Sequence, residues 1–198
     1  MTNLKRDGYS LVELLIAMAL TAIVLTGLVA LFSYGTHNMR ITQAMVALQN
    51  QAKDATNHIS TYAMEASDIK WDEVNKVLTI KRESVPQQIN SEGNYPDPDI
   101  ETCYYWWADS DGDGVGAVYF AKHDKVADPS DPTKANLTSG QNFLLADDIE
   151  DFRCEVKENE DTGKKVLHVE MQLENERAKF ECKKDIYMRN QTSEEETE

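Results

Sequence analysis

The stretch Leu14–Phe32 reads LLIAMALTAIVLTGLVALF, nineteen residues without a charge. As an α-helix it would be about 28 Å long, close to the ~30 Å hydrocarbon core of a bilayer. Lys5 and Arg6 precede it, which favours a cytoplasmic N-terminus. The run is longer than the apolar core of a cleavable secretion signal, about 7–15 residues. The sequence therefore predicts one membrane-spanning helix that anchors an external domain.

One carboxylate does not suit a plain anchor. Glu13 lies at the edge of the apolar run, four residues after Tyr9. A charge at membrane depth costs about 2.5–3.5 kcal/mol on insertion scales and usually has a function. The surrounding residues, from Lys5 to Ala17, read KRDGYSLVELLIA. This segment resembles the prepilin leader and N-terminal segment of type IV pilins and type II secretion pseudopilins.

The resemblance implies processing of the N-terminus. A prepilin peptidase would remove residues 1–8 by cutting between Gly8 and Tyr9, and Tyr9 would then be N-methylated. Tyr9 stands where the family usually has Phe, and Glu13 becomes the fifth mature residue. In a filament, Glu13 would pair with the free α-amine of Tyr9 in a neighbouring subunit. Such pairing would offset the cost of burying each charge alone.

An amphipathic pattern follows the apolar run and reaches Ser67 without a proline. Its apolar positions recur at alternating spacings of four and three residues: Ile41, Met45, Leu48, Ala52, Ala55, Ile59, Tyr62 and Ala66. This spacing predicts that the helix continues beyond the membrane. A coiled-coil dimer is one interpretation of the stripe. Its small alanines favour instead close packing on a sheet of the same chain.

The helical period ends near Asp68, and segments typical of strands follow. They are Ile69–Trp71, Val77–Ile80, Thr102–Trp107, Ala117–Ala121, Phe152–Val156, Val166–Leu173 and Ala178–Met188. Their succession predicts an antiparallel sheet with one face free for the helix, and hence an α+β fold. We expect five segments: a leader (1–8), the membrane-spanning half of the helix (9–35), its amphipathic half (36–67), the sheet domain (68–190) and an acidic disordered tail (191–198).

Charge and motifs restrict the function. The chain has 20 Lys and Arg against 35 Asp and Glu, a net charge of −15, which argues against direct contact with nucleic acid. No nucleophile elbow, phosphate loop or HExxH spacing occurs, which argues against an enzyme. Asn142–Phe152 and Asp185–Asn190 resemble the corresponding strands of J-type minor pseudopilins. This second resemblance implies a minor subunit.

A candidate metal site lies in the sheet domain. Asp109–Gly114 reads DSDGDG, which matches the first half of a calcium loop, with Asp109, Asp111 and Asp113 as ligands. The twelfth position of such a loop should be Glu, but here it is Phe120. Two Asp-Gly pairs between strands are also a strong turn signal. Both a plain turn and bound calcium stay open, and no other cofactor is expected.

Cysteine pairing also stays open. Cys154 and Cys182 lie in expected strands of an external domain, where a disulfide is allowed if their Cα atoms come within about 7 Å. Cys103 would then be the odd cysteine.

Together these observations predict a minor type IV pilin-like structural subunit in the cytoplasmic membrane, with its N-terminus inside and its C-terminal domain outside, that later joins a pilus or pseudopilus. The resemblance implies that its partners are other pilin subunits, prepilin peptidase, the inner-membrane assembly platform and membrane lipid. A pilus, type II secretion and DNA uptake are equally open. The alternative is a single-pass, membrane-anchored, calcium-dependent binding module, in which Asp109, Asp111 and Asp113 would matter more than Glu13.

Overall fold

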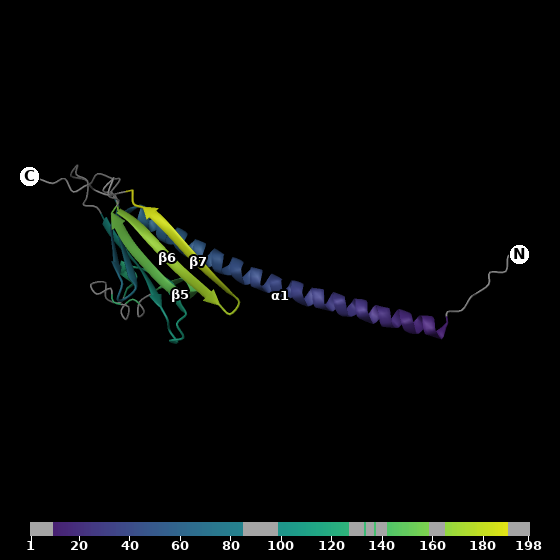
Figure 1. Cartoon of the computed structure of the whole chain (residues 1–198). Coiled ribbons are helices and arrows are strands. Elements are labelled where there is room, and N and C mark those ends of the chain that lie inside the picture. The colour runs from purple at the N-terminus through teal and green to yellow at the C-terminus, as the bar shows by residue number, and fades with distance from the viewer. Residues whose placement is uncertain are drawn as a thin grey trace, which may run out of the picture. The chain divides into compact units, whose positions relative to one another are not determined.

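The computed structural model describes residues 10–84, 99–126, 133, 137, 142–158 and 165–189. The chain divides into two compact units, residues 1–43 and 44–198. One helix, α1 (Leu11–Met64), begins in the first unit and ends in the second. The second unit also holds a seven-stranded antiparallel sheet, so the fold is α+β as the sequence predicted (Figure 1).

In the first unit, no described residue packs over the side chains of α1. Residues 10–43 are all exposed, and the large apolar ones keep 37–80% of their surface accessible. Among the described residues, α1 is the one helix long and apolar enough to cross a membrane, by length and composition. Its hydroxyls are satisfied locally, since Thr21 Oγ1 donates to the Ala17 carbonyl and Thr26 Oγ1 to the Ala22 carbonyl, both at 2.8 Å. A helix surrounded by lipid or protein needs such internal bonds.

In the second unit, α1 buries the stripe that its periodicity predicted. Four predicted members are fully buried on the helix: Leu48, Ala52, Ala55 and Ile59. Ile41 is exposed, Met45 and Tyr62 are partly buried, and Ala63, which the stripe did not include, is fully buried. The fully buried residues form one core with side chains from the strands, which confirms that the stripe packs on a sheet of the same chain.

The helix ends at Met64, three residues before the end expected at Ser67. Ala66 already pairs with Arg82 in the first two strands of the sheet, so the chain has turned by that point. The Met64 carbonyl accepts a hydrogen bond of 2.9 Å from the backbone N–H of Arg189. The last turn of α1 is thus tied to the chain just after the last strand.

The strands follow one another in sequence order across the sheet, each antiparallel to the next. They are β1 (Ala66–Asp72), β2 (Val77–Ser84), β3 (Asp99–Ala108), β4 (Gly116–Lys122), β5 (Phe143–Glu158), β6 (Lys165–Asn175) and β7 (Ala178–Tyr187). Each strand segment expected from the sequence overlaps one of them. A short 3-10 helix, η1 (His123–Lys125), follows β4.

The largest difference from expectation is the length of β5, which begins nine residues before Phe152. Its first part pairs with β4 and its later part with β6. The pairing with β4 shifts in register between Ala146 and Ile149, around Asp148, whose φ of 56° is left-handed, and the pairing with β6 shifts between Ile149 and Asp151. Such a bulge interrupts the alternation of apolar and polar residues from which a strand is recognised.

The sheet has two apolar faces of unequal size. The inner face carries the core shared with the part of α1 in the second unit, which Figure 1 shows beside β6 and β7. On the other face lies a smaller cluster of buried side chains: Val77, Tyr104, Trp106, Ala121, Val126 and Leu137. The main packing layer is therefore helix on sheet.

Replacing Ile59 with Ala tests this packing. Ile59 is fully buried between α1 and the sheet. The cavity left by this change should lower the free energy of unfolding by about 2–5 kcal/mol. Val46→Ala, on the same helix but with 47% of the residue exposed, should change it by less than about 0.5 kcal/mol. Denaturant unfolding of the full chain in detergent, followed by tryptophan fluorescence, measures both. Equal effects would contradict the packing described.

Candidate functional site

The described chain begins at Ser10, so Gly8 and Tyr9 lie outside the described residues. Ser10 caps the start of α1: its side-chain Oγ accepts the N–H of Val12 at 3.3 Å and its carbonyl accepts the N–H of Leu14 at 3.1 Å. Ser is a favourable N-cap residue because it satisfies a free backbone donor. The helix therefore starts directly after the expected cleavage point.

Glu13 is the one acidic residue in the first turn of α1. A carboxylate there is favoured by the partial positive charge of the helix N-terminus. Its neighbours Leu11 and Leu14 are 80% and 59% exposed, and Glu13 is also exposed. No residue of the described segments forms an ion pair with it. Covering this apolar surface with lipid or protein would leave the Glu13 carboxylate without an ion-pair partner among the described residues, which is costly for a charged group.

The N-terminal segment matches a known family. Residues 3–29 match the family described as the prokaryotic N-terminal methylation motif. This motif is the leader of type IV pilins and pseudopilins, so the chain carries a type IV pilin-like N-terminus, as its residues predicted. No curated protein and no solved structure matches the chain.

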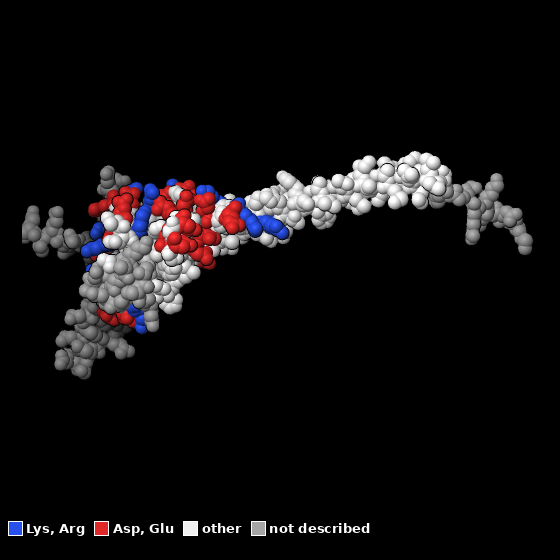
Figure 2. Space-filling model, turned by 90° about the horizontal axis from the view of Figure 1, so that it is seen from below, with Lys and Arg blue, Asp and Glu red and all other residues white. Residues whose placement is uncertain are grey.

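The two units differ sharply in charge. Residues 44–198 hold 33 of the 35 acidic and 17 of the 20 basic residues, a net charge of −16. On the face drawn in Figure 2, acidic side chains gather over the second unit, whereas the first half of α1 is nearly free of charge. This separation fits a helix that avoids water and a domain that is solvated by it.

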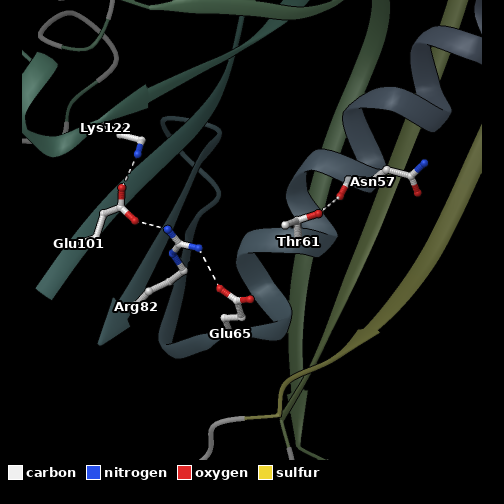
Figure 3. A network of polar contacts seen from close by, with 6 residues as sticks. All are labelled: Asn57, Thr61, Glu65, Arg82, Glu101 and Lys122. Carbon is white, nitrogen blue, oxygen red and sulfur yellow. Dashed lines mark hydrogen bonds and ion pairs between the residues drawn. The ribbon is translucent and has the colours of Figure 1, made fainter. Parts of the chain in front are cut away.

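Sequence reasoning missed a polar network at the end of α1 (Figure 3). Arg82 of β2 donates from Nη1 to Glu65 Oε2, just after α1, at 2.9 Å and from Nη2 to Glu101 of β3. Glu101 also accepts a hydrogen bond from Lys122 of β4. The bonds from Lys122 and Arg82 lower the pKa of the Glu101 carboxyl. The network ties the end of α1 to three strands, and its members share no sequence spacing that could have revealed it.

The acidic segment between β3 and β4 forms a hairpin turn. Asp109 accepts backbone N–H groups through both carboxylate oxygens, from Gly112 at 2.7 Å and from Gly114 at 2.9 Å. These bonds lower the pKa of Asp109. Gly112 and Gly114 have φ angles of 81° and 91°, which favour glycine. The turn interpretation of DSDGDG therefore describes the observed backbone.

The same turn brings three carboxylates together. One oxygen from each of Asp109, Asp111 and Asp113 lies within 4.8 Å of the other two. They supply only part of the six to eight oxygens that Ca²⁺ takes. Phe120, at the twelfth position, is buried and its ring centroid lies 5.1 Å from that of Tyr105. It cannot supply the ligand that Glu gives in a calcium loop.

The disulfide considered between Cys154 and Cys182 is not formed, and all three cysteines are free. Cys154 of β5 pairs with Val169 of β6, whereas Cys182 of β7 pairs with Met171 of β6. A whole strand therefore separates the two cysteines. Two strand spacings of about 4.8 Å exceed the ~7 Å limit on the Cα distance of a disulfide.

Thiol labelling tests this arrangement. Cys103 and Cys154 are buried, whereas Cys182 is partly exposed. Burial raises the pKa of Cys103 to about 12 and that of Cys154 well above its usual range, so both stay protonated and unreactive. A maleimide should therefore add once to the folded chain, at Cys182, and three times after unfolding without reductant, as read by intact mass. Cys182→Ser is the control and should take no label when folded. A single adduct on the unfolded, unreduced chain would instead show a disulfide.

Proposed function

We propose that this chain is a minor type IV pilin-like structural subunit, processed by a prepilin peptidase and assembled into, or priming, a pilus or pseudopilus filament. The observation that carries the proposal is the methylation motif at residues 3–29, continuous with a helix whose apolar side chains are exposed. The proposed role is assembly rather than catalysis.

Processing would divide the chain at Gly8. The leader (1–8) would be removed and Tyr9 N-methylated, leaving residues 9–35 as the membrane and filament-core part of the helix and 36–67 as its amphipathic part. The sheet domain (68–190) and the tail (191–198) would follow. The Ser10 cap supports this division, because α1 begins at Leu11, two residues after the proposed new N-terminus.

Glu13 would fix the position of the subunit in the filament. Cleavage leaves a free α-amine on Tyr9, and both this ammonium and the Glu13 carboxylate would be costly to bury alone. Pairing Glu13 of one subunit with Tyr9 of the next offsets both costs. Since Glu13 is the only acidic or basic residue between Ser10 and Thr36, only one axial register satisfies it.

The proposed partners are other pilin or pseudopilin subunits, prepilin peptidase, the inner-membrane assembly platform and membrane lipid. Before assembly the N-terminus would lie in the cytoplasm and the acidic sheet domain outside the membrane, in line with Lys5 and Arg6 ahead of the apolar run. The resemblance of Asn142–Phe152 and Asp185–Asn190 to J-type minor pseudopilins supports the minor role.

Intact mass tests the processing. The full chain is expressed in hosts with and without a prepilin peptidase, and its mass is measured from membranes. We expect loss of residues 1–8 only with the peptidase, and a new N-terminus about 14 Da heavier from one methyl group. A chain that keeps Met1 in both hosts would refute the proposal and leave an anchored domain.

Replacing Glu13 with Gln tests the assembly step. The change keeps shape but leaves the Tyr9 ammonium unpaired, a loss of about 3–5 kcal/mol for a buried pair, or on the order of 100-fold or more in the assembly constant. We expect normal cleavage but loss of the chain from sheared filaments. Asp54→Asn, which removes an exposed acid later on α1, is the matched control and should assemble normally. Normal assembly of the Gln variant would contradict the role given to Glu13.

A further inference from the structure

His58 lies where α1 packs on β3 and β4. Its ring stacks on Tyr62 of the same helix, with centroids 5.0 Å apart. It makes edge contacts with Phe120 of β4 at 4.6 Å and with Tyr105 of β3 at 5.7 Å. Three aromatic rings from the helix and two strands thus surround one imidazole. A group that titrates near neutral pH is built into the helix–sheet junction.

A hydrogen bond defines the form of the imidazole that fits this place. His58 Nδ1 lies 3.1 Å from the hydroxyl of Tyr105. Tyr105 is fully buried, and burial raises its pKa far above the ordinary value, so it keeps its proton. The phenol can therefore donate to Nδ1 of a neutral His58 that carries its proton on Nε2. Protonation of Nδ1 removes this acceptor. The buried Tyr105 hydroxyl would then have no acceptor for its hydrogen at this position, which costs free energy.

A permanent cation, the Arg82 guanidinium, lies on the Tyr62 ring that stacks with His58. The guanidinium carbon of Arg82 is 4.3 Å from the centroid of the Tyr62 ring. A proton on His58 would place a further positive charge on a ring that already carries Arg82. Desolvation by burial lowers the pKa of His58 from its ordinary value. Geometry and burial both favour the neutral imidazole.

Charged side chains near His58 come from the helix and from each strand packed at this junction. Glu101 of β3 and Lys122 of β4 are bonded to each other, and Glu65 after α1 is bonded to Arg82. Asp54 precedes His58 by one helical turn and is exposed. Its negative charge favours protonation of His58, but water and salt screen exposed charges. The paired acids are already neutralised by their partners.

We propose that His58 is an acid-sensitive latch: the neutral imidazole holds the end of α1 on β3 and β4, and proton uptake loosens that contact. The latch concerns the second unit alone and does not depend on the chain being a filament subunit. In the unfolded chain His58 titrates near 6.5. Above that pH both states are neutral and the latch is closed. As the pH falls below 6.5 the unfolded state binds the proton first, so stability declines until the folded group is also protonated.

A titration of the full chain in detergent micelles tests the latch. Selective ¹³C labelling of the four histidines gives one ring signal each, and His58→Phe assigns the signal of His58. We expect a midpoint below 6.5 for His58. Hydrogen exchange, corrected for the intrinsic rate at each pH, should show protection in the last two turns of α1 falling from pH 6.5 down to that midpoint and levelling off below it. A midpoint at or above 6.5, or protection that does not change, would overturn the proposal.

Two variants locate the effect. The double variant His58→Phe with Tyr105→Phe leaves an aromatic ring at both positions and removes both ends of the hydrogen bond, so the pH-dependent loss of protection should disappear. His168→Gln is the matched control: this histidine lies on β6, bonded to Asp185 of β7, and the pH effect should persist without it. If the effect persists in the double variant, another group is responsible and the proposal fails. If the double variant does not fold, the titration of the unaltered chain still decides the outcome.

Discussion

The structure depends on the packing of one alanine-rich stripe of α1 against the inner face of the sheet. Ala52, Ala55 and Ala63 are fully buried, and they belong to one core with side chains from the strands. The strands complete the core by alternation, most clearly in β6, where Leu167, Val169 and Met171 are fully buried while His168 and Glu170 between them are partly exposed. In β6 this contact decides which face of the strand is apolar, and a shift of register by one residue would turn that face away from the helix.

The same helix meets two different environments, and its side chains change accordingly. In the first unit the apolar residues are exposed and the threonine hydroxyls bond to the preceding turn. In the second unit Thr56 and Ser60 are buried, and they use the same device, donating to the carbonyls of Ala52 and Thr56 at 2.7 Å. Hydroxyls that are satisfied within the helix can face lipid, protein or core without an unpaired donor. The two halves of α1 therefore satisfy their hydroxyls in the same way and differ in burial: the first half is exposed, and the second half packs on the sheet.

Much of this fold follows from local patterns. The uncharged run and the helical period that follows it identified α1. The strand segments were recognised from β-branched and aromatic residues between turn signals, and in the last three also from a period of two. The leader motif is also local, since Gly8, Tyr9 and Glu13 are close in sequence. The residue pattern alone placed the start of β5 too late, because a bulge at Asp148 breaks the alternation. The relation of Cys154 to Cys182 was missed because spacing says nothing of a strand between them. The Arg82 network joins residues from four segments, which only the folded chain brings together.

The outer face of the sheet shows how an acidic domain stays compact. Across β5, β6 and β7, Arg153 lies opposite Glu170, which in turn lies opposite Lys183, with the last two joined at 3.0 Å. Opposite charges on adjacent strands offset each other, whereas like charges there would destabilise the sheet. The edge strand β7 alternates Lys179, Glu181, Lys183 and Asp185 on this face, and charged edges oppose uncontrolled pairing with other sheets. The charges along β7 thus disfavour edge-to-edge association of the sheet domain. The exposed apolar side chains in the first half of α1 are where burial by lipid or protein would be favourable. In the filament proposed above, contact between subunits would then involve the helix rather than the sheet, and Glu13 would set the register.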